Sequence, residues 1–290
     1  MRPVPTRLLF LALALASVPL AAATPPFDVV ERSIPELQAA LSEGRVTSRG
    51  LVESYLLRIA LYEDRLNATI SVNPKALEEA DALDRERAAG RLRGPLHGIP
   101  VAIKDNVHVD GMATTGGALA FAGLVAPYEA TLAANLRAAG AIVLAKTQMT
   151  ELANWVATGM PTNYNGLNGY GFNPYDPRRD PRAATGDGRP ALATGGSSSG
   201  TGTAASFWAA NVGTETSGSI LSPASANLLV GIKPTVGRVS RHGVIPITAD
   251  QDTAGPMART VADAAILLGA LEGSGADPDD PATGRCPEPA

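Results

Sequence analysis

Apolar residues recur every three to four positions in the first third of the chain, which is the period of an α-helix. Residues 33–44 begin with a capping box, because Ser33 and Glu36 stand three positions apart. Residues 47–66 place their apolar side chains on one helical face, and residues 73–90 are rich in Ala, Glu and Arg. We therefore expect three helices, which act as a scaffold.

Beyond residue 94 the pattern changes to short continuous apolar runs that end in Gly, Asn or Asp. Two such runs, residues 99–103 and 141–144, predict strands, and the stretch 130–139 between them predicts a helix. Strand, helix and strand at this spacing indicate an α/β sheet. Residues 162–190 have no apolar periodicity and are expected to form a long surface excursion.

Residues 1–23 have the composition of a secretory signal peptide. Arg2 and Arg7 precede the apolar run 8–16, and a run of small residues ends at Ala23. The apolar run is too short to span a bilayer. We expect removal of this segment, a secreted or periplasmic protein and no stable membrane anchor; the alternative is a buried N-terminal helix.

Charge and cysteine content exclude several classes of protein. The chain has 24 Lys and Arg, 28 Asp and Glu and a formal net charge of −4, so it is not a strongly basic nucleic-acid binder, and no nucleic-acid partner is expected. The single cysteine, Cys286, cannot form an intramolecular disulfide or a cysteine-based metal site. The three histidines do not form an H-x-x-x-H pattern, so no zinc-hydrolase site is expected.

Lysine is rare enough to draw attention to individual positions. Only four of the 24 basic residues are Lys, and Lys104 closes the apolar run 98–103. Unlike a guanidinium, a buried amine can lose its proton and act as a base near neutral pH. The structural alternative is a snorkelling side chain or an ion pair with Asp105.

Two tracts of small residues could supply further chemistry. Residues 194–202 read TGGSSSGTG and precede the apolar run 204–210, as in a flexible loop that caps a helix. Residues 212–223 read VGTETSGSILSP, and a turn at 216–219 could direct N–H groups at one point, as an oxyanion hole does, or be an ordinary β-turn. Serine needs a base to become a nucleophile, and with few histidines a Ser-Lys arrangement is chemically reasonable.

These blocks together resemble the amidase-signature family, most closely its secreted or periplasmic peptide-amidase branch. The resemblance extends in order over roughly residues 33–272. The three blocks that carry it are GIPVAIKDN (98–106), GGSSSG (195–200) and GTETSGSI (213–220), with support from GAIVLAKT (140–147), GIKPTVGRVS (231–240) and QDTAGPMAR (251–259).

The resemblance implies an α/β fold in which helices flank a mixed β-sheet. The amidase domain would occupy residues 24–272, and residues 273–290 would be a Pro/Asp/Gly-rich linker or truncated tail. Family members are much longer, so the fold is expected to be incomplete at its C-terminus. A fragment of this kind is expected to be poorly stable or inactive, and cooperative unfolding with amide hydrolysis by residues 24–290 would contradict that expectation.

The resemblance also implies a catalytic relay. Ser219 would be the acyl-forming nucleophile, Ser197 the bridging serine and Lys104 the final proton acceptor. The family pattern further implies a cis peptide bond between Gly196 and Ser197, at a cost of about 3–4 kcal/mol. Carboxamide C–N bonds would be cleaved through an acyl-enzyme, with no metal or organic cofactor.

The backbone N–H groups of Thr216, Ser217, Gly218 and Ser219 would form the oxyanion hole. The implied substrate is a small-molecule or peptide amide. Many members have Arg where this chain has Leu221, which argues against recognition of an acidic or glutamine-like substrate at that position.

Three rival interpretations remain. GSSSG at 196–200 fits the G-x-S-x-G elbow of α/β-hydrolases, with Ser198 as nucleophile and His242 as base, although residues 191–194 make a poor preceding strand. GTGTAA at 200–205 matches a dinucleotide-binding pattern, again without a preceding strand. The third interpretation is an inactive, truncated homologue that has kept the fold.

Overall fold

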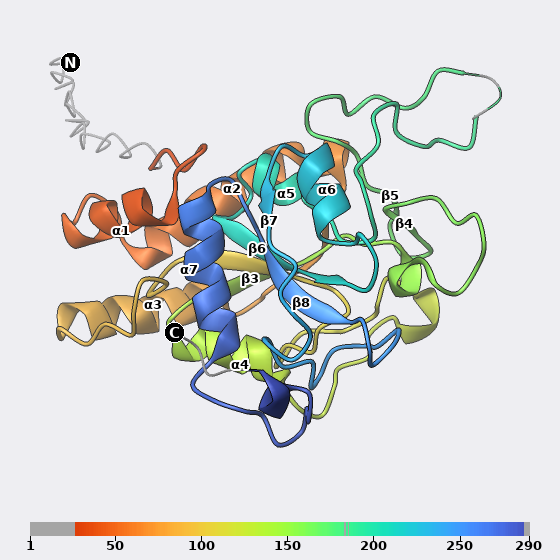
Figure 1. Cartoon of the computed structure of the whole chain (residues 1–290). Helices are drawn as coiled ribbons and strands as arrows, with labels where there is room; N and C mark the ends of the chain where they lie inside the picture. The colour runs from red at the N-terminus through yellow and green to blue at the C-terminus, as the bar shows by residue number, and fades with distance from the viewer. Residues whose placement is uncertain (1–26, 183, 185, 287–290) are drawn as a thin grey trace, which may run out of the picture.

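A six-stranded mixed sheet forms the centre of the computed structural model, which describes residues 27–182, 184 and 186–286 (Figure 1). The strand order is β1-β3-β2-β6-β8-β7; β3, β2 and β6 are parallel, and the remaining neighbours are antiparallel. The strands are β1 (Thr69–Val72), β2 (Pro100–Lys104), β3 (Ile142–Thr147), β6 (Ala210–Glu215), β7 (Val230–Gly231) and β8 (Thr253–Ala258), and a separate hairpin consists of β4 (Tyr164–Asn165) and β5 (Gly169–Tyr170).

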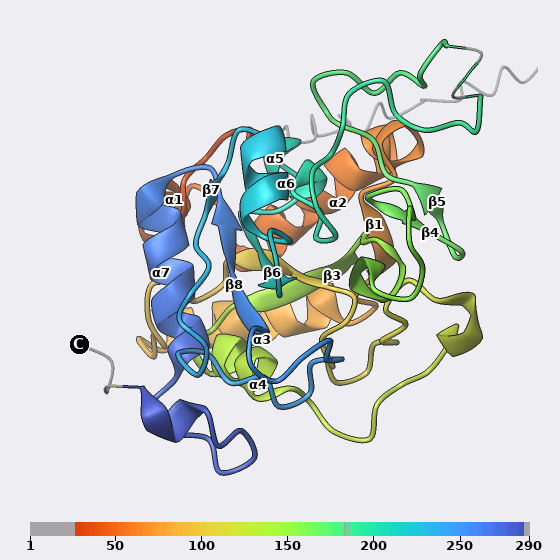
Figure 2. The ribbon, with the colours of Figure 1, turned by 45° about the vertical axis from the view of Figure 1, so that its right-hand side comes forward.

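Helices flank this sheet, as the fold prediction stated. Helix α2 packs against α3, while α4 packs against α7, which covers β8 in Figure 2. The helices are α1 (Ile34–Ser42), α2 (Ser48–Leu66), α3 (Ala76–Ala88), α4 (Thr131–Ala138), α5 (Thr201–Ala204), α6 (Leu221–Ala226) and α7 (Val261–Glu272), with short 3-10 turns η1 (Leu119–Phe121), η2 (Glu151–Asn154) and η4 (Thr283–Arg285). The expected mixed α/β architecture is therefore confirmed.

The predicted helix starts are confirmed at the level of individual hydrogen bonds. The N–H of Ser33 donates to the Glu36 carboxylate at 2.8 Å, and the Ser33 hydroxyl accepts the N–H of Glu36 at 3.4 Å. The start of α2 has a cap that the sequence pattern did not indicate. Asp84, from α3, accepts the N–H groups of Ser48 and Arg49 at 2.7 and 3.0 Å, which joins the first turn of one helix to the body of the next.

The predicted strands are buried throughout, as expected for parallel strands covered on both faces. Ala102 lies opposite Asn211 and Ile103 opposite Val212, while Lys104 lies opposite Thr147 of β3. The carboxyl ends of β2, β3 and β6 consequently meet at one edge of the sheet. In open α/β sheets this edge is where ligands bind.

The run 204–210 is not the helix that the sequence predicted. Helix α5 ends at Ala204, and Ser206 has a left-handed φ of 55°. Phe207 and Trp208 then turn into the core, where both are fully buried, and the chain passes directly into β6. Burial of two large aromatic rings decides the conformation here, because helical continuation would separate them from the core.

Much of the described part of the segment 162–190 forms the predicted excursion and projects from the body beside α6 in Figures 1 and 2, whereas Asn163, Asn165 and Asn173 are fully buried. It contains the β4–β5 hairpin, which the sequence pattern did not reveal. Among the described residues no helix has the length and apolar character needed to cross a bilayer. The signal-peptide prediction for residues 1–23 lies outside the described residues.

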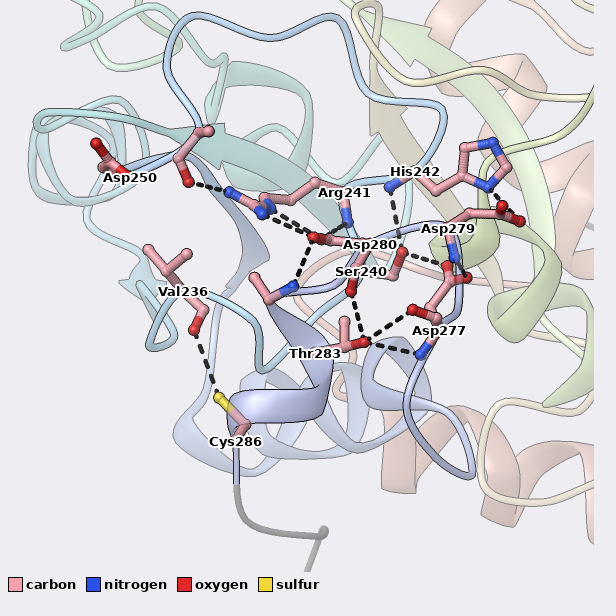
Figure 3. Close-up of polar contacts among 12 residues, drawn as sticks. Val236, Ser240, Arg241, His242, Asp250, Asp277, Asp279, Asp280, Thr283 and Cys286 are labelled. Atoms are coloured by element: carbon pink, nitrogen blue, oxygen red, sulfur yellow. Dashed lines mark hydrogen bonds and ion pairs between the residues drawn. The ribbon is translucent and has the colours of Figure 1, made fainter.

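Residues 276–286 lie against the loop that follows β7, as Figure 3 shows. The carboxylate of Asp277 accepts hydrogen bonds from Thr131 and Ser240, both at 2.5 Å. Arg241 forms an ion pair with Asp280 at 2.7 Å, and the thiol of Cys286 donates to a backbone carbonyl oxygen at 3.4 Å. This polar network ties the C-terminal segment to the body of the protein.

Candidate active site

Lys104 lies at the carboxyl end of β2 and is completely buried. Its ammonium nitrogen, Nζ, donates to Thr214 Oγ1 at 3.0 Å and to Ser197 Oγ at 3.2 Å, and no carboxylate of the described chain forms an ion pair with it. Burial lowers the pKa of Lys104 to about 7, while the charges of Asp252 and Glu215 act in the opposite direction. The amine can therefore exchange its proton near neutral pH.

A continuous chain of hydrogen bonds runs from this amine to the surface. The Ser197 hydroxyl, 3% exposed, accepts from Lys104 and donates to Ser219 Oγ at 2.8 Å. Ser219 itself is partly exposed. The structure thus brings together the three predicted side chains, and it connects a buried base with a hydroxyl that a substrate could reach.

Two glycines allow the loop that carries Ser197 to approach the turn that carries Ser219. A Cβ on Gly196 would lie 2.9 Å from the carbonyl oxygen of Gly218, and one on Gly195, whose φ is +95°, would lie 2.3 Å from the Cα of Pro223. Only residues without a side chain fit here.

The peptide bond that precedes Ser197 is trans, so the implied cis bond to Gly196 is wrong. The left-handed Gly195 turns the chain at this point. The loop is also held from the other side, because the N–H of Thr150 donates to the Ser197 carbonyl oxygen at 3.1 Å.

The turn at 216–221 is organised around the carboxylate of Glu215. This side chain is 4% exposed and accepts three backbone N–H groups, those of Gly218 at 2.9 Å, Ile220 at 2.6 Å and Leu221 at 2.9 Å. Three donors satisfy a carboxylate that would otherwise be costly to bury. Glu215 therefore binds backbone N–H groups on both sides of Ser219.

This arrangement changes the set of donors that the sequence suggested for an oxyanion hole. The N–H of Gly218 is already bound to Glu215, so it is not available to a substrate in this conformation. Within the described part of the chain, the N–H groups of Thr216, Ser217 and Ser219 have no protein acceptor. These three remain the candidates for binding an oxyanion.

The ion pair that the sequence offered to Lys104 belongs to a different lysine. Asp105 lies 3.2 Å from Lys146 Nζ, both side chains are fully buried, and Lys146 donates to Thr114 Oγ1 at 3.2 Å. Asp105 also accepts the N–H of Thr115 at 3.0 Å. Asp105 is the first residue after β2, and its carboxylate contacts Lys146 and Thr115 instead of the amine of Lys104.

We expect Lys146→Met to destabilise the protein by about 3–5 kcal/mol, because the change leaves the Asp105 carboxylate buried without its counter-ion. Chemical denaturation measures the loss as a lower midpoint. The double variant Lys146→Met/Asp105→Asn removes the uncompensated charge and is expected to recover part of the loss. Equal stability of Lys146→Met and the wild type would show that the pair contributes nothing.

The elbow required by an α/β-hydrolase is not built. Ser198 is fully buried and its hydroxyl is engaged with the backbone of Thr214, donating to the carbonyl oxygen at 3.0 Å and accepting the N–H at 3.2 Å. His242 stacks on Tyr128 and lies 3.5 Å from Asp279. The structure therefore does not pair Ser198 with His242.

The dinucleotide-binding pattern at 200–205 has a structural explanation. A Cβ on Gly202 would lie 2.1 Å from the ring of Trp208, so the glycine is needed for close packing against an aromatic side chain. The strand nearest in sequence, β6, follows the pattern instead of preceding it. A pyrophosphate-binding loop has the opposite features, because it follows a strand and its glycines approach the ligand.

His242, Asp277 and Asp279 gather near the C-terminal segment, and their potential ligand atoms lie within 4.8 Å of one another (Figure 3). One carboxylate oxygen of Asp277 already accepts the hydroxyls of Thr131 and Ser240. None of the three residues hydrogen-bonds to the Lys104 relay. Their contacts fasten the C-terminal segment.

Three residues of the site were not recognised from the sequence. Thr214 receives a hydrogen bond from Lys104 and another from Asn106, Glu215 organises the turn, and Asp252 accepts the hydroxyl of Thr216. For Glu215 the available signal was an acidic side chain in an otherwise uncharged tract, because such a charge needs several donors when it is buried. Their partners are set by the tertiary structure.

Comparison with known proteins points to one family. The family model for amidases matches residues 50–290. A probable amidase of Arabidopsis thaliana is 41% identical over 262 residues, which cover 89% of this chain and 48% of that protein. A putative amidase of Arthroderma benhamiae is 39% identical over 254 residues, which cover 87% of this chain and 40% of that protein.

Solved structures give the same result. The native peptide amidase from Stenotrophomonas maltophilia superposes with a TM-score of 0.81 and 45% identity, covering 91% of this chain and 52% of its own. An amidase family protein from Bacillus anthracis superposes with a TM-score of 0.81 and 41% identity, covering 89% and 49%. The chain spans about half the length of these relatives. The resemblance seen in the sequence is confirmed, and the chain belongs to the amidase family.

Proposed function

We propose that this chain carries the acyl-transfer centre of a serine hydrolase that cleaves carboxamide C–N bonds. The observation that carries the proposal is the unbroken contact from Lys104 Nζ through Ser197 Oγ to Ser219 Oγ, with separations of 3.2 and 2.8 Å. A buried amine with a pKa of about 7 is the base that such a relay needs at neutral pH.

Acylation begins when Ser219 Oγ forms a bond to the amide carbonyl carbon. The Ser219 proton passes to Ser197, and the Ser197 proton passes to the neutral amine of Lys104. Serine hydroxyls rotate and both donate and accept, so the direction of the hydrogen bonds can reverse during the transfer. The relay returns the proton to the leaving nitrogen as the C–N bond breaks, and ammonia or an amine departs.

Water then attacks the acyl-enzyme by the same path, and the acid is released as the proton returns to Ser219. The N–H groups of Thr216, Ser217 and Ser219 are the proposed donors to the oxyanion of both tetrahedral intermediates. Removal of one such donor typically costs about 2.7–4 kcal/mol of transition-state stabilisation. No step requires a metal ion or an organic cofactor.

A neutral amide, either a small molecule or the C-terminal amide of a peptide, is the proposed substrate class. The peptide amidase from Stenotrophomonas maltophilia supports the peptide alternative. Leu221, 46% exposed and two residues beyond Ser219, presents an apolar side chain next to the nucleophile. It offers no cation to a substrate carboxylate.

Release of ammonia from a panel of simple and peptide amides tests the function directly. The panel should pair each peptide amide with the corresponding free acid and with a substrate whose amide is a side-chain carboxamide. Turnover of neutral amides supports the proposal. If no amide is hydrolysed and a fluorophosphonate probe does not label Ser219, the proposal is wrong.

We also propose that the protein is exported to the periplasm or the exterior, on the basic, apolar and small-residue pattern of residues 1–23. N-terminal sequencing of protein recovered from the extracytoplasmic fraction tests this proposal. A new terminus close to residue 24 would support export, whereas protein that keeps Met1 in the cytoplasm would contradict it.

Replacing His242 by Ala distinguishes the Lys104 relay from the Ser-His alternative. We expect kcat/KM to stay within about threefold of the wild type, because His242 contacts Tyr128 and Asp279 and not the relay. A loss of several orders of magnitude would instead favour a histidine base. Hydrolysis of the best amide in the panel provides the measurement.

A further inference from the structure

Glu215 is the last residue of β6 and the only acidic side chain within the tract 212–223. Its two carboxylate oxygens divide the backbone around Ser219 between them. Oε1 accepts the N–H of Gly218, on the N-terminal side, and Oε2 accepts the N–H groups of Ile220 and Leu221, on the C-terminal side. The nucleophile therefore sits in a backbone loop closed by one side chain.

We infer that Glu215 is a positioning residue, which holds this turn in the conformation that places Ser219 Oγ within hydrogen-bonding distance of Ser197. The inference rests on the function proposed above. It deepens that proposal by assigning the geometry of the nucleophile to a residue that touches neither substrate nor the transferred proton.

The middle of the turn gains little from side-chain packing. Gly218, with a φ of +81°, has no Cβ and no heavy atom within 4 Å of where one would be, so side-chain packing does not constrain it. Ser217 is exposed. Other contacts hold its two ends. The Thr216 hydroxyl donates to Asp252, the carbonyl oxygens of Gly218 and Ser219 accept backbone N–H groups at 2.9 and 3.3 Å, and Ile220 is fully buried. Glu215 adds the contact that joins the N–H groups on both sides of Ser219 to the end of β6.

Asp252 is a natural comparison, because it shares one property of Glu215 and lacks the other. The negative charges of both carboxylates raise the pKa of Lys104 and so favour its charged form. Asp105, the other buried acid beside β2, forms its ion pair with Lys146. Asp252, however, accepts the Thr216 hydroxyl and does not bind the backbone that flanks Ser219. Substitutions at the two positions can therefore separate charge from positioning.

Three variants make the separation. Glu215→Asp keeps the charge but is one methylene shorter, so it cannot reach all three N–H groups. Glu215→Gln keeps the side-chain length but removes the charge. Its amide NH2 group would also face backbone N–H groups, which need an acceptor. Asp252→Asn removes a charge near Lys104 and leaves the Glu215 bonds in place.

The measurement is the pH dependence of two rates in the whole chain, labelling by a fluorophosphonate probe and hydrolysis of an amide. For Glu215→Asp we expect the plateau rate to fall on the order of 10²-fold, with the acidic limb unchanged. For Glu215→Gln we expect the same fall together with an acidic limb moved to lower pH. For Asp252→Asn we expect the limb to move in the same direction, with a plateau within about tenfold of the wild type.

A plateau for Glu215→Asp equal to that of the wild type would overturn the inference. Failure of Glu215→Asp to fold would also overturn it, because a residue that only positions a turn is dispensable for the global fold; thermal unfolding monitors this. A wild type that is neither labelled nor active contradicts the proposed function itself. The two failures are therefore distinguishable.

Discussion

Ser219→Ala is expected to lower kcat for amide hydrolysis on the order of 10⁶-fold and to abolish labelling by a fluorophosphonate probe. The change removes the only oxygen that can form the acyl-enzyme in the proposed mechanism. Lys104 and Ser197 keep their mutual contact at 3.2 Å, but they no longer have a substrate-facing hydroxyl to activate. Residual hydrolysis would then reflect only binding and oxyanion stabilisation.

Ser222→Ala is a suitable control for this prediction. Ser222 lies three residues further along, on α6, and is exposed, so loss of its hydroxyl should leave activity and labelling within about twofold of the wild type. Thermal unfolding should be unchanged in both variants. Persistent labelling of Ser219→Ala would mean that another serine is the nucleophile, and peptide mapping of the labelled protein would identify it.

The sequence could predict the positions that local chemistry determines. The capping box at Ser33, the buried strand that ends at Lys104 and the glycine-rich approach to Ser197 all follow from residue type and spacing. The three side chains of the relay could be named because the resemblance placed them in separate blocks. Their mutual distances could not be predicted, because they come from three different segments of the chain.

The partners of buried charges were the part that sequence reasoning could not supply. Asp105 was available in sequence to Lys104 but lies beside Lys146, a residue of the adjacent strand. Glu215 holds the turn, but the small residues around it in the sequence do not indicate which backbone groups it binds. The predicted helix over 204–210 failed for a related reason: burial of Trp208 in the core overrides local propensity.

Hydrogen bonds made by backbone groups also escape sequence patterns. The tract 216–219 contains four N–H groups that look equivalent when read as letters. In the structure Gly218 donates to Glu215, and the other three do not donate to protein acceptors within the described residues. The side chain of Glu215, which directly precedes the tract, thus reduces the number of N–H groups available to an oxyanion.

Lys104→Met is expected to lower kcat/KM on the order of 10⁴-fold at pH 8, because it removes the final proton acceptor while keeping an unbranched side chain of similar volume. The wild type should show an acidic limb near pH 7, below which the rate falls tenfold per pH unit as Lys104 becomes protonated. In the variant this limb should be absent from the residual rate. The exposed Lys75→Met provides the matched control and should retain the wild-type profile.

The same substitution has an expected effect on stability, and its sign follows from the lowered pKa. Between pH 7 and the ordinary lysine pKa of 10.5, the unfolded chain binds a proton at Lys104 that the folded chain does not bind. Wild-type stability therefore gains from this group as pH rises through that window, and the group is most unfavourable below pH 7. Lys104→Met should exceed the wild type in free energy of unfolding most clearly below pH 7, and the difference should shrink as the pH rises toward 10. A difference that is constant with pH would mean that the folded amine titrates normally, and Lys104 could then not be the base of the relay.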